Sequence, residues 1–104
     1  MEFKQLEMFV ALAEERSVQR AADKVFRGQP AVSMAMAKLE QEVGWPLFVR
    51  RDRFRLTEAG ETLYGYARAL LQLRKEANAA VYQRPERAGR RPADAAAVPA
   101  GENA

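Results

Sequence analysis

The sequence predicts a mainly α-helical protein, in which three helices and a short β-hairpin form a winged helix-turn-helix and one long helix follows. Three observations lead to this fold class. Two apolar stripes with helical spacing meet at a short glycine-containing turn, and two short apolar segments flank an arginine-rich turn further on. A third apolar stripe, longer than the other two, comes last. Helix, short turn and helix, with a hairpin after them, is the sequence pattern of this fold.

Composition limits the chain to one folded domain. Of the 104 residues, the segment 84–104 holds seven Ala, three Pro and two Gly, with Val98 as its one large apolar residue, so we predict a disordered tail there. The other 83 residues are few for a lone stable core, to which a dimer interface would add. The expected organisation is a winged helix-turn-helix over 1–58, a linker and dimerisation helix over 59–83, and the tail.

The chain contains no cysteine and no histidine. This composition excludes disulfides, thiolate catalysis, histidine acid–base catalysis and Cys/His metal sites. A glycine-rich phosphate loop is also missing from the sequence, so we expect neither an enzyme nor a metal or other cofactor. The longest apolar run, residues 8–13, is too short for a membrane span or a signal peptide, which predicts a cytoplasmic protein.

The first helix is expected over residues 3–14 as part of the scaffold. Its apolar residues are Leu6, Phe9, Val10 and Ala13 on one face, with Met8 and Leu12 beside them. Ser17 follows as the expected N-cap of the second helix. A hydroxyl at a helix start can also hold a DNA phosphate, so both roles stay open for Ser17.

Residues 17–39 carry the helix-turn-helix pattern. The apolar stripe of the second helix is Val18, Ala21, Ala22, Val25 and Phe26, and that of the third helix, residues 29–43, is Val32, Met36, Leu39 and Val43. Gly28 tolerates the left-handed conformation of a tight turn, and Pro30 suits the first turn of a helix. The second helix of such a motif enters the DNA major groove. An ordinary αα-hairpin would show the same stripes, so both interpretations stay open on this stretch.

The candidate base contacts lie opposite the apolar stripe of the third helix. They are Gln29, Pro30, Ser33, Met34, Ala37, Lys38 and Gln41. Glutamine can pair with adenine through two hydrogen bonds, serine can contact a base or a phosphate, and Met34 could meet a thymine methyl group. Only Lys38 is charged, which makes this a small polar set for a helix that reads bases.

A hairpin is expected after the third helix, whose C-cap is Gly44. Two strands over residues 47–50 and 54–56 flank its turn. The turn region holds four arginines, Arg50, Arg51, Arg53 and Arg55. Such arginines can enter the minor groove or bind phosphate, a role we favour over a solvated loop. From residue 16 to 55 nine Lys or Arg face four Asp or Glu, a local charge of +5 within a net charge of +3.

A long helix is expected from its N-cap, Thr57, to about residue 83. A 3-4 repeat like a coiled-coil seam is formed by Leu63, Tyr66, Leu70, Leu73, Ala77 and Ala80. The first turns of this stripe are expected to pack on the domain itself. A helix of roughly 40 Å is too long for so small a core to cover. We therefore predict that its far half pairs with a second copy of the chain in a homodimer.

Four segments, in this order, cover much of the chain before the predicted tail: LEMFVALAEERSVQRAADKV, QPAVS, LEQEVGWPLFVRR and LTEAG. In order and spacing they resemble the N-terminal DNA-binding domain of LysR-type transcriptional regulators, over about residues 1–83. The resemblance implies a winged helix-turn-helix and a linker helix that dimerises antiparallel. It also implies that Gln29, Pro30, Ser33 and Met34 face bases or nearby phosphates. Arg53 would be the wing arginine.

Two departures from the family pattern change these expectations. After the serine, family members commonly have Arg, Gln, Ile and a basic residue, where this chain has Met34, Ala35, Met36 and Ala37. Fewer polar groups then reach the groove or its edge. Each lost bidentate contact to a base costs about 1–3 kcal/mol of discrimination between sequences. Family members also carry a larger effector-binding domain after the linker helix. We therefore expect no small-molecule effector site in this chain, whether it is a fragment or a short stand-alone member.

Two functions follow from these observations. We favour sequence-preferring binding of double-stranded DNA by a dimeric transcriptional regulator associated with the nucleoid. Helix 29–43 would lie in the major groove and residues 50–55 on the backbone or minor groove. The alternative is a protein-interaction module, in which a degenerate winged helix pairs with another protein through its linker helix and an apolar surface at positions 34, 35 and 37. The arginine-rich turn argues against this alternative.

Overall fold

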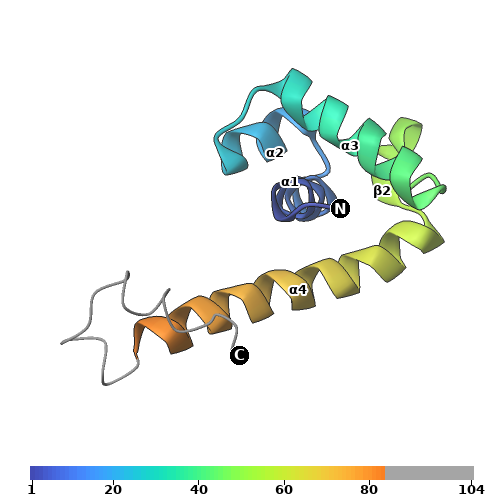
Figure 1. Ribbon diagram of the computed structural model, residues 1–104. Coiled ribbons are helices and arrows are strands. Elements are labelled where there is room, and N and C mark those ends of the chain that lie inside the picture. Colours follow the sequence, from blue (N-terminus) through green and yellow to red (C-terminus); the bar gives the residue numbers. More distant parts are fainter. Residues whose placement is uncertain (84–104) are drawn as a thin grey trace. The chain divides into compact units, whose positions relative to one another are not determined.

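The computed structural model describes residues 1–83 of the chain (Figure 1). Its elements are α1 (Phe3–Glu15), α2 (Val18–Val25), α3 (Gln29–Val43), β1 (Phe48–Val49), the 3-10 helix η1 (Arg50–Asp52), β2 (Arg55–Leu56) and α4 (Glu58–Tyr82). The predicted fold class, helices with a small antiparallel hairpin, is confirmed. The predicted tail, residues 84–104, lies outside the described residues. Two compact units divide the chain, residues 1–72 and 73–104, and α4 runs from the first into the second.

Helices α1, α2 and α3 pack against one another in the first unit (Figure 1). The buried core side chains are Leu6, Met8, Phe9, Ala11, Leu12, Ala21, Ala22, Val32, Met36, Leu39, Leu47, Phe48 and Ala67. The core-facing stripe of α1 differs slightly from the predicted one, since Val10 and Ala13 are half-buried while Ala11 is buried. The stripe of α3 is confirmed, with its first three members buried and Val43 half-buried.

The helix ends follow local signals in the sequence. The Ser17 hydroxyl accepts a 3.2 Å hydrogen bond from the Arg20 N–H, so the predicted N-cap of α2 is confirmed. Thr57 caps α4 in the same way, accepting a 3.0 Å hydrogen bond from the Gly60 N–H. Gly44 ends α3 with a φ of 81°, the left-handed conformation that glycine adopts without steric cost.

The turn between α2 and α3 differs from the prediction in two ways. Its left-handed residue is Phe26, with a φ of 59°, whereas Gly28 has a φ of −75° as the N-cap of α3. Phe26 also leaves the apolar stripe to which the spacing assigns it, because its side chain is 92% exposed. Both differences have one cause. Helix α2 ends at Val25, and helical spacing does not extend past the left-handed residue that ends a helix.

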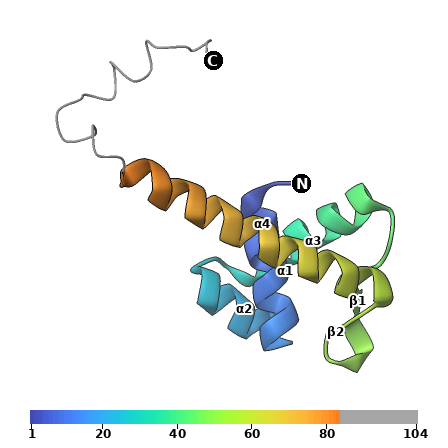
Figure 2. The ribbon, with the colours of Figure 1, turned by 90° about the horizontal axis from the view of Figure 1, so that it is seen from below.

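The hairpin is shorter than predicted. Its strands hold two residues each, with Phe48 paired to Leu56 and Val49 to Arg55, and they lie beside the start of α4 (Figure 2). The predicted strand residue Arg50 begins η1 instead, and Phe54 has a left-handed φ of 56°. A 3-10 turn followed by left-handed residues cannot continue a β-ladder, because a ladder needs extended backbone. The hairpin is therefore a compact tip on a short stem.

The first half of α4 packs on the core. The residues of α4 that lie buried or half-buried there are Ala59, Gly60, Leu63, Tyr64, Ala67 and Leu71. A Cβ atom at Gly60 would stand 2.2 Å from the carbonyl oxygen of Leu47, so only glycine lets the helix approach the hairpin this closely. The Thr57 hydroxyl adds a 2.7 Å hydrogen bond to the carbonyl of Pro46. The start of α4 is thereby fixed against the segment that leads into β1.

Candidate nucleic-acid interface

Helix α3 presents to solvent the face that lies opposite its core residues. The exposed residues on it are Gln29, Pro30, Ser33, Met34, Ala37, Lys38 and Gln41. This is the whole set expected from the sequence, and Met34 is 72% exposed. An α-helix with its side chains is about 10–12 Å across, which matches the roughly 12 Å width of the B-DNA major groove. The exposed face can therefore lie in that groove, with Gln29, Ser33 and Lys38 as hydrogen-bonding groups.

Ala35, expected to share an apolar surface with Met34 and Ala37, is less exposed than either of them. It is half-buried and packs against the core. The apolar positions of the exposed face after Ser33 are therefore Met34 and Ala37. In the protein-interaction alternative, Ala35 would therefore contribute less exposed surface than Met34 and Ala37.

Two helix starts offer groups that can bind a phosphate. The hydroxyl oxygen of Ser17 is occupied as the N-cap acceptor of α2, but its O–H can still donate a hydrogen bond. Gly28, the N-cap of α3, supplies no capping side chain. The N–H groups of Ala31 and Val32 donate to the Gly28 carbonyl, and Pro30 has no N–H, so the N–H of Gln29 is the one left at this helix start to bind an anion, which the positive end of the helix dipole favours.

The wing, a name we use for residues 48–56, is tied to the helices at its base. The ring of Phe48 is buried, 5.4 Å from that of Phe9 in α1 and 5.9 Å from that of Phe54, measured between ring centroids. From α3, the Glu40 carboxylate accepts a 2.7 Å hydrogen bond from the N–H of Leu47. Aromatic packing and this hydrogen bond therefore set the position of the wing beside α3.

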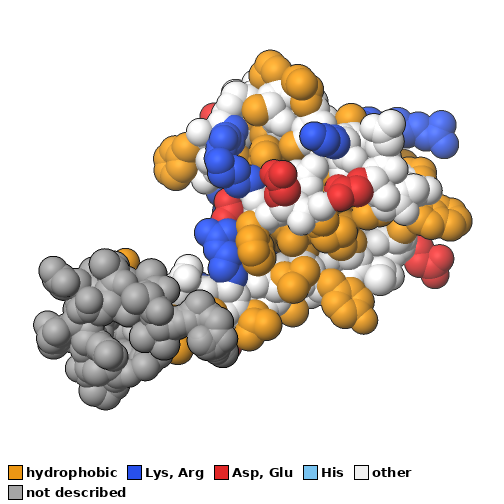
Figure 3. Space-filling model, viewed as in Figure 1, with side chains coloured by type: hydrophobic (Ala, Val, Ile, Leu, Met, Phe, Trp, Pro, Cys, Tyr) orange, Lys and Arg blue, Asp and Glu red, His pale blue; other side chains and the backbone are white. Residues whose placement is uncertain are grey.

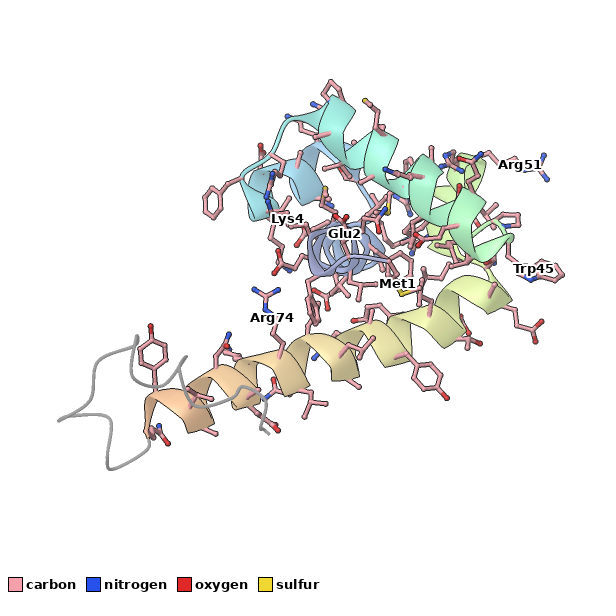
Figure 4. All side chains as sticks on the ribbon, in the orientation of Figure 1. Met1, Glu2, Lys4, Trp45, Arg51 and Arg74 are labelled. Atoms are coloured by element: carbon pink, nitrogen blue, oxygen red, sulfur yellow. The ribbon has the colours of Figure 1, made fainter. Side chains whose placement is uncertain are left out.

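The four wing arginines fall into two groups. Arg50 pairs with Glu40 at 3.1 Å and Arg55 pairs with Asp52, whose pKa is lowered mainly by that hydrogen bond. Arg51 and Arg53 take part in no ion pair within residues 1–83. The Arg51 side chain points outward from the wing (Figure 4). Arg51 and Arg53 are therefore the wing cations that can bind phosphate without first breaking an ion pair.

Arg27 is a further candidate that the sequence patterns did not single out. It is exposed in the turn just before α3 and takes part in no ion pair of the described part of the chain. Its backbone N–H is occupied, donating a 2.9 Å hydrogen bond to the carbonyl of Ala22 at the end of α2. The signal that could have found it is a basic residue directly before α3, which counted above only toward the local charge.

The stripe predicted for dimerisation is divided between core and surface. Leu63 is half-buried against the core of its own domain, as expected for the first turns. Tyr66 and Leu70 in the first unit are 68% and 41% exposed, and Leu73 in the second is 62% exposed. Ala77 and Ala80 are also exposed. Figure 3 shows hydrophobic side chains (orange) at the surface among those of Lys and Arg (blue).

The exposed groups of α3 and of the wing include guanidinium, ammonium, amide and hydroxyl groups, which recognise phosphates and base edges. Within residues 1–83, no group of three or more Asp or Glu side chains is placed to hold a metal ion. In the same part of the chain, no helix combines the length and the apolar character of a membrane span.

The sequence model for bacterial regulatory helix-turn-helix proteins of the LysR family matches residues 3–61, from α1 into the first turn of α4. The chain belongs to the LysR family. The family resemblance and the fold class expected from the sequence are thereby confirmed. Members of this family are transcriptional regulators, which favours the predicted function class over the protein-interaction alternative.

Two relatives illustrate the extent of the similarity. The HTH-type transcriptional regulator BudR of Klebsiella aerogenes is 47% identical over 74 residues, which are 70% of this LysR-family chain and 52% of BudR. A probable RuBisCO transcriptional regulator of Cyanidioschyzon merolae is 44% identical over 73 residues, 69% of this chain and 24% of the relative. The chain thus spans 24% to 52% of the length of these relatives.

Solved structures of the family share the fold. The BenM DNA-binding domain in complex with benA site 1 DNA matches with a TM-score of 0.76 at 34% identity, covering 80% of this chain and 94% of that one. Vibrio fischeri DarR in complex with DNA matches with a TM-score of 0.75 at 30% identity, covering 79% of this chain and 28% of DarR.

Proposed function

We propose that this LysR-family chain binds double-stranded DNA with a sequence preference, as a dimer that regulates transcription at the nucleoid in the cytoplasm. The observation that carries the proposal is the pairing of one exposed face of α3 with a wing tied to the same helix through Glu40. Two arginines of that wing, Arg51 and Arg53, take part in no ion pair within residues 1–83. The arrangement suits a helix in the major groove with cations beside it on the phosphates.

In this proposal, α3 reads bases with a short set of side chains. Gln29 and Ser33 offer hydrogen bonds to base edges, Met34 offers an apolar contact to a thymine methyl group, and Lys38 offers one cation. Pro30 and the backbone N–H of Gln29 approach the DNA backbone. Because Met34 and Ala37 supply no hydrogen bonds, we expect sequence discrimination to be modest and phosphate contacts to supply most of the affinity.

The wing arginines would then have distinct roles. Arg51 and Arg53 bind phosphate or enter the minor groove, with Ser17 as a further phosphate contact. Arg50 and Arg55 mainly hold the shape of the wing through Glu40 and Asp52. The solved complexes of BenM and DarR with DNA support placing this surface on DNA, since both share the fold at 34% and 30% identity.

Dimerisation would use the exposed apolar stripe of α4. Its members by helical spacing are Tyr66, Leu70, Leu73, Ala77 and Ala80, while Leu63 serves the core. Family membership supports an antiparallel pairing of two such helices. A two-fold symmetric dimer would place two recognition helices on two half-sites, so the preferred DNA should be a near-palindrome.

The proposal is tested with the 104-residue chain and a pool of random DNA duplexes. Fluorescence anisotropy over a series of salt concentrations gives the affinity and its salt dependence, and sequencing of the bound fraction gives the preference. Salt-steep binding that enriches a near-palindrome is the expected result. Binding without enrichment would remove the sequence preference from the proposal, and no binding at moderate salt would overturn DNA binding itself.

A further inference from the structure

Arg16 ends α1 in a backbone conformation that glycine usually occupies. Its φ and ψ are 56° and 30°, in the left-handed region, and its N–H donates a 2.8 Å hydrogen bond to the carbonyl of Leu12. Glycine is common at this place after a helix because it adopts the left-handed conformation without steric cost. An arginine here has a conformational cost, which contacts of its side chain must offset.

The Arg16 side chain reaches the tip of the wing, far along the chain. Its Nε donates a 3.1 Å hydrogen bond to the carbonyl of Arg53, and its Nη2 donates a 3.2 Å hydrogen bond to the carbonyl of Asp52. A guanidinium group presents its donors in a rigid planar fork, so it holds two neighbouring carbonyl oxygens at once. A lysine ammonium at this position would keep the charge without the fork.

The backbone that Arg16 holds is strained. The 3-10 helix η1 ends at Asp52, and the next two residues, Arg53 and Phe54, are both left-handed, with φ of 51° and 56°. Left-handed residues other than glycine persist where the surrounding structure holds them. The two hydrogen bonds from Arg16 supply such support at the point from which the Arg53 side chain extends.

We propose that Arg16 is a positioning residue for DNA binding, which locks the tip of the wing to the end of α1 and so presents Arg53 at a fixed distance from α3. This inference rests on the proposed function. Arg16 directly precedes Ser17, the N-cap of α2, so one short segment both starts the helix-turn-helix and anchors the wing. Without the fork the tip moves freely, and the binding of Arg53 to DNA must then also order the tip.

The first test needs no DNA. In Arg16→Gly the left-handed backbone stays favourable and the side chain is gone, whereas in Arg16→Lys the charge stays and the fork is gone. NMR ¹⁵N relaxation of the free protein is expected to show increased motion at residues 51–54 in both variants, with α3 unchanged. Unchanged relaxation at the tip would overturn the proposal, whether or not the chain binds DNA.

The second test measures affinity for a duplex selected from the random pool. Both variants are expected to bind about three- to tenfold more weakly than the wild type, since two charge-assisted hydrogen bonds no longer order the tip. In an Arg53→Ala background, Arg16→Gly should weaken binding by less than about twofold, because the side chain that Arg16 positions is absent. Wild-type affinity in Arg16→Lys, or an undiminished effect in that background, would show a role through charge or direct contact and overturn the proposal.

Thermal unfolding separates positioning from a merely structural role. Arg16→Gly should unfold within about 2 °C of the wild type, because glycine relieves the left-handed strain while two exposed hydrogen bonds disappear. If Arg16→Gly is partly unfolded at the temperature of the binding assay, and the loss of folded protein fully accounts for the weaker binding, the result counts against positioning. If the wild type binds no duplex, the proposed function fails, and the relaxation measurement alone decides the role of Arg16.

Discussion

The Tyr64 hydroxyl donates a 2.7 Å hydrogen bond to the Glu14 carboxylate, which joins α4 to the end of α1. The same carboxylate accepts Lys24 of α2 at 3.0 Å and Arg68 of α4 at 3.3 Å, and the Arg68 guanidinium also lies over the Tyr64 ring. Three helices therefore meet at one side chain. Through Glu14, the first half of α4 is tied to α1 and α2, so this cluster can be probed with single substitutions.

Tyr64→Phe should lower the free energy of unfolding by about 1–3 kcal/mol, because the lost hydroxyl makes two hydrogen bonds, one donated to Glu14 and one accepted from Arg68 at 3.0 Å, each contributing about 0.5–1.5 kcal/mol. The substitution removes the hydroxyl but keeps the ring on the core. Urea unfolding followed by circular dichroism measures the change. Tyr66→Phe is the matched control, because Tyr66 is on the same helix, is 68% exposed, and its hydroxyl makes no hydrogen bond within the described residues. Equal effects of the two substitutions would contradict the assignment.

The stability of the protein should depend on the protonation of Glu14. The hydrogen bond from Tyr64, followed by that from Lys24, lowers the pKa of this carboxyl below its ordinary value. A lowered pKa stabilises the fold above the ordinary value of about 4.3, and this contribution disappears as the pH falls through the lowered pKa. Glu14→Gln should therefore be less stable than the wild type at pH 7, with the difference shrinking in acid. If the difference in free energy of unfolding between Glu14→Gln and the wild type stays the same from pH 7 to pH 3, this prediction is contradicted.

Gly60→Ala should be strongly destabilising, by about 1–3 kcal/mol or more, as expected of overpacking. The added Cβ would stand 2.2 Å from the Leu47 carbonyl oxygen. This is a contact between the backbone of α4 and that of residue 47, which cannot move aside as a flexible side chain can. Gly65→Ala, five positions along α4, is the control, since a Cβ there meets nothing within 4 Å. That control should gain up to about 1 kcal/mol from helix propensity. Thermal unfolding of both variants gives the comparison.

Arg51→Ala and Arg53→Ala should each weaken binding to most DNA sequences and lower the slope of log affinity against log salt by about 0.9, the value for one phosphate contact. Arg50→Ala should change the slope less, because Arg50 is paired with Glu40. Gln29→Ala is the uncharged control, expected to relax base preference at an unchanged slope. Anisotropy titrations at four or more salt concentrations measure these slopes. An unchanged slope in Arg53→Ala would show the wing assignment to be wrong.

Leu73→Glu should shift the protein from dimer to monomer, since it places a charge in the proposed apolar seam of α4. Ala79→Glu adds the same charge to α4 on the side away from that stripe at 3.6 residues per turn, so it should leave the dimer intact. Sedimentation equilibrium gives the dissociation constants. If both variants dimerise as the wild type does, the seam lies elsewhere.

Local chemistry allowed the helix ends and much of the candidate interface to be predicted from the sequence. Ser17, Pro30 and Gly44 act on neighbours a few residues away, so their roles do not depend on the rest of the fold. The exposed face of α3 follows in the same way from the spacing of its buried residues. The hairpin tip was less predictable, because two left-handed residues without glycine, Arg53 and Phe54, replace an extended strand end.

Tertiary structure alone decided which of several possible partners each side chain took. On α4, helical spacing allows two apolar stripes. In the folded chain the stripe with Gly60, Tyr64 and Leu71 packs on the core, and Tyr66 and Leu70 remain at the surface. The pairings of the wing arginines and the reach of the Arg16 side chain to the wing likewise join segments that are distant in sequence. The sequence by itself determined the four helices and the exposed face of α3, since those depend on near neighbours. Contacts between distant segments depend on the competition among all partners in the folded chain, which no local pattern expresses.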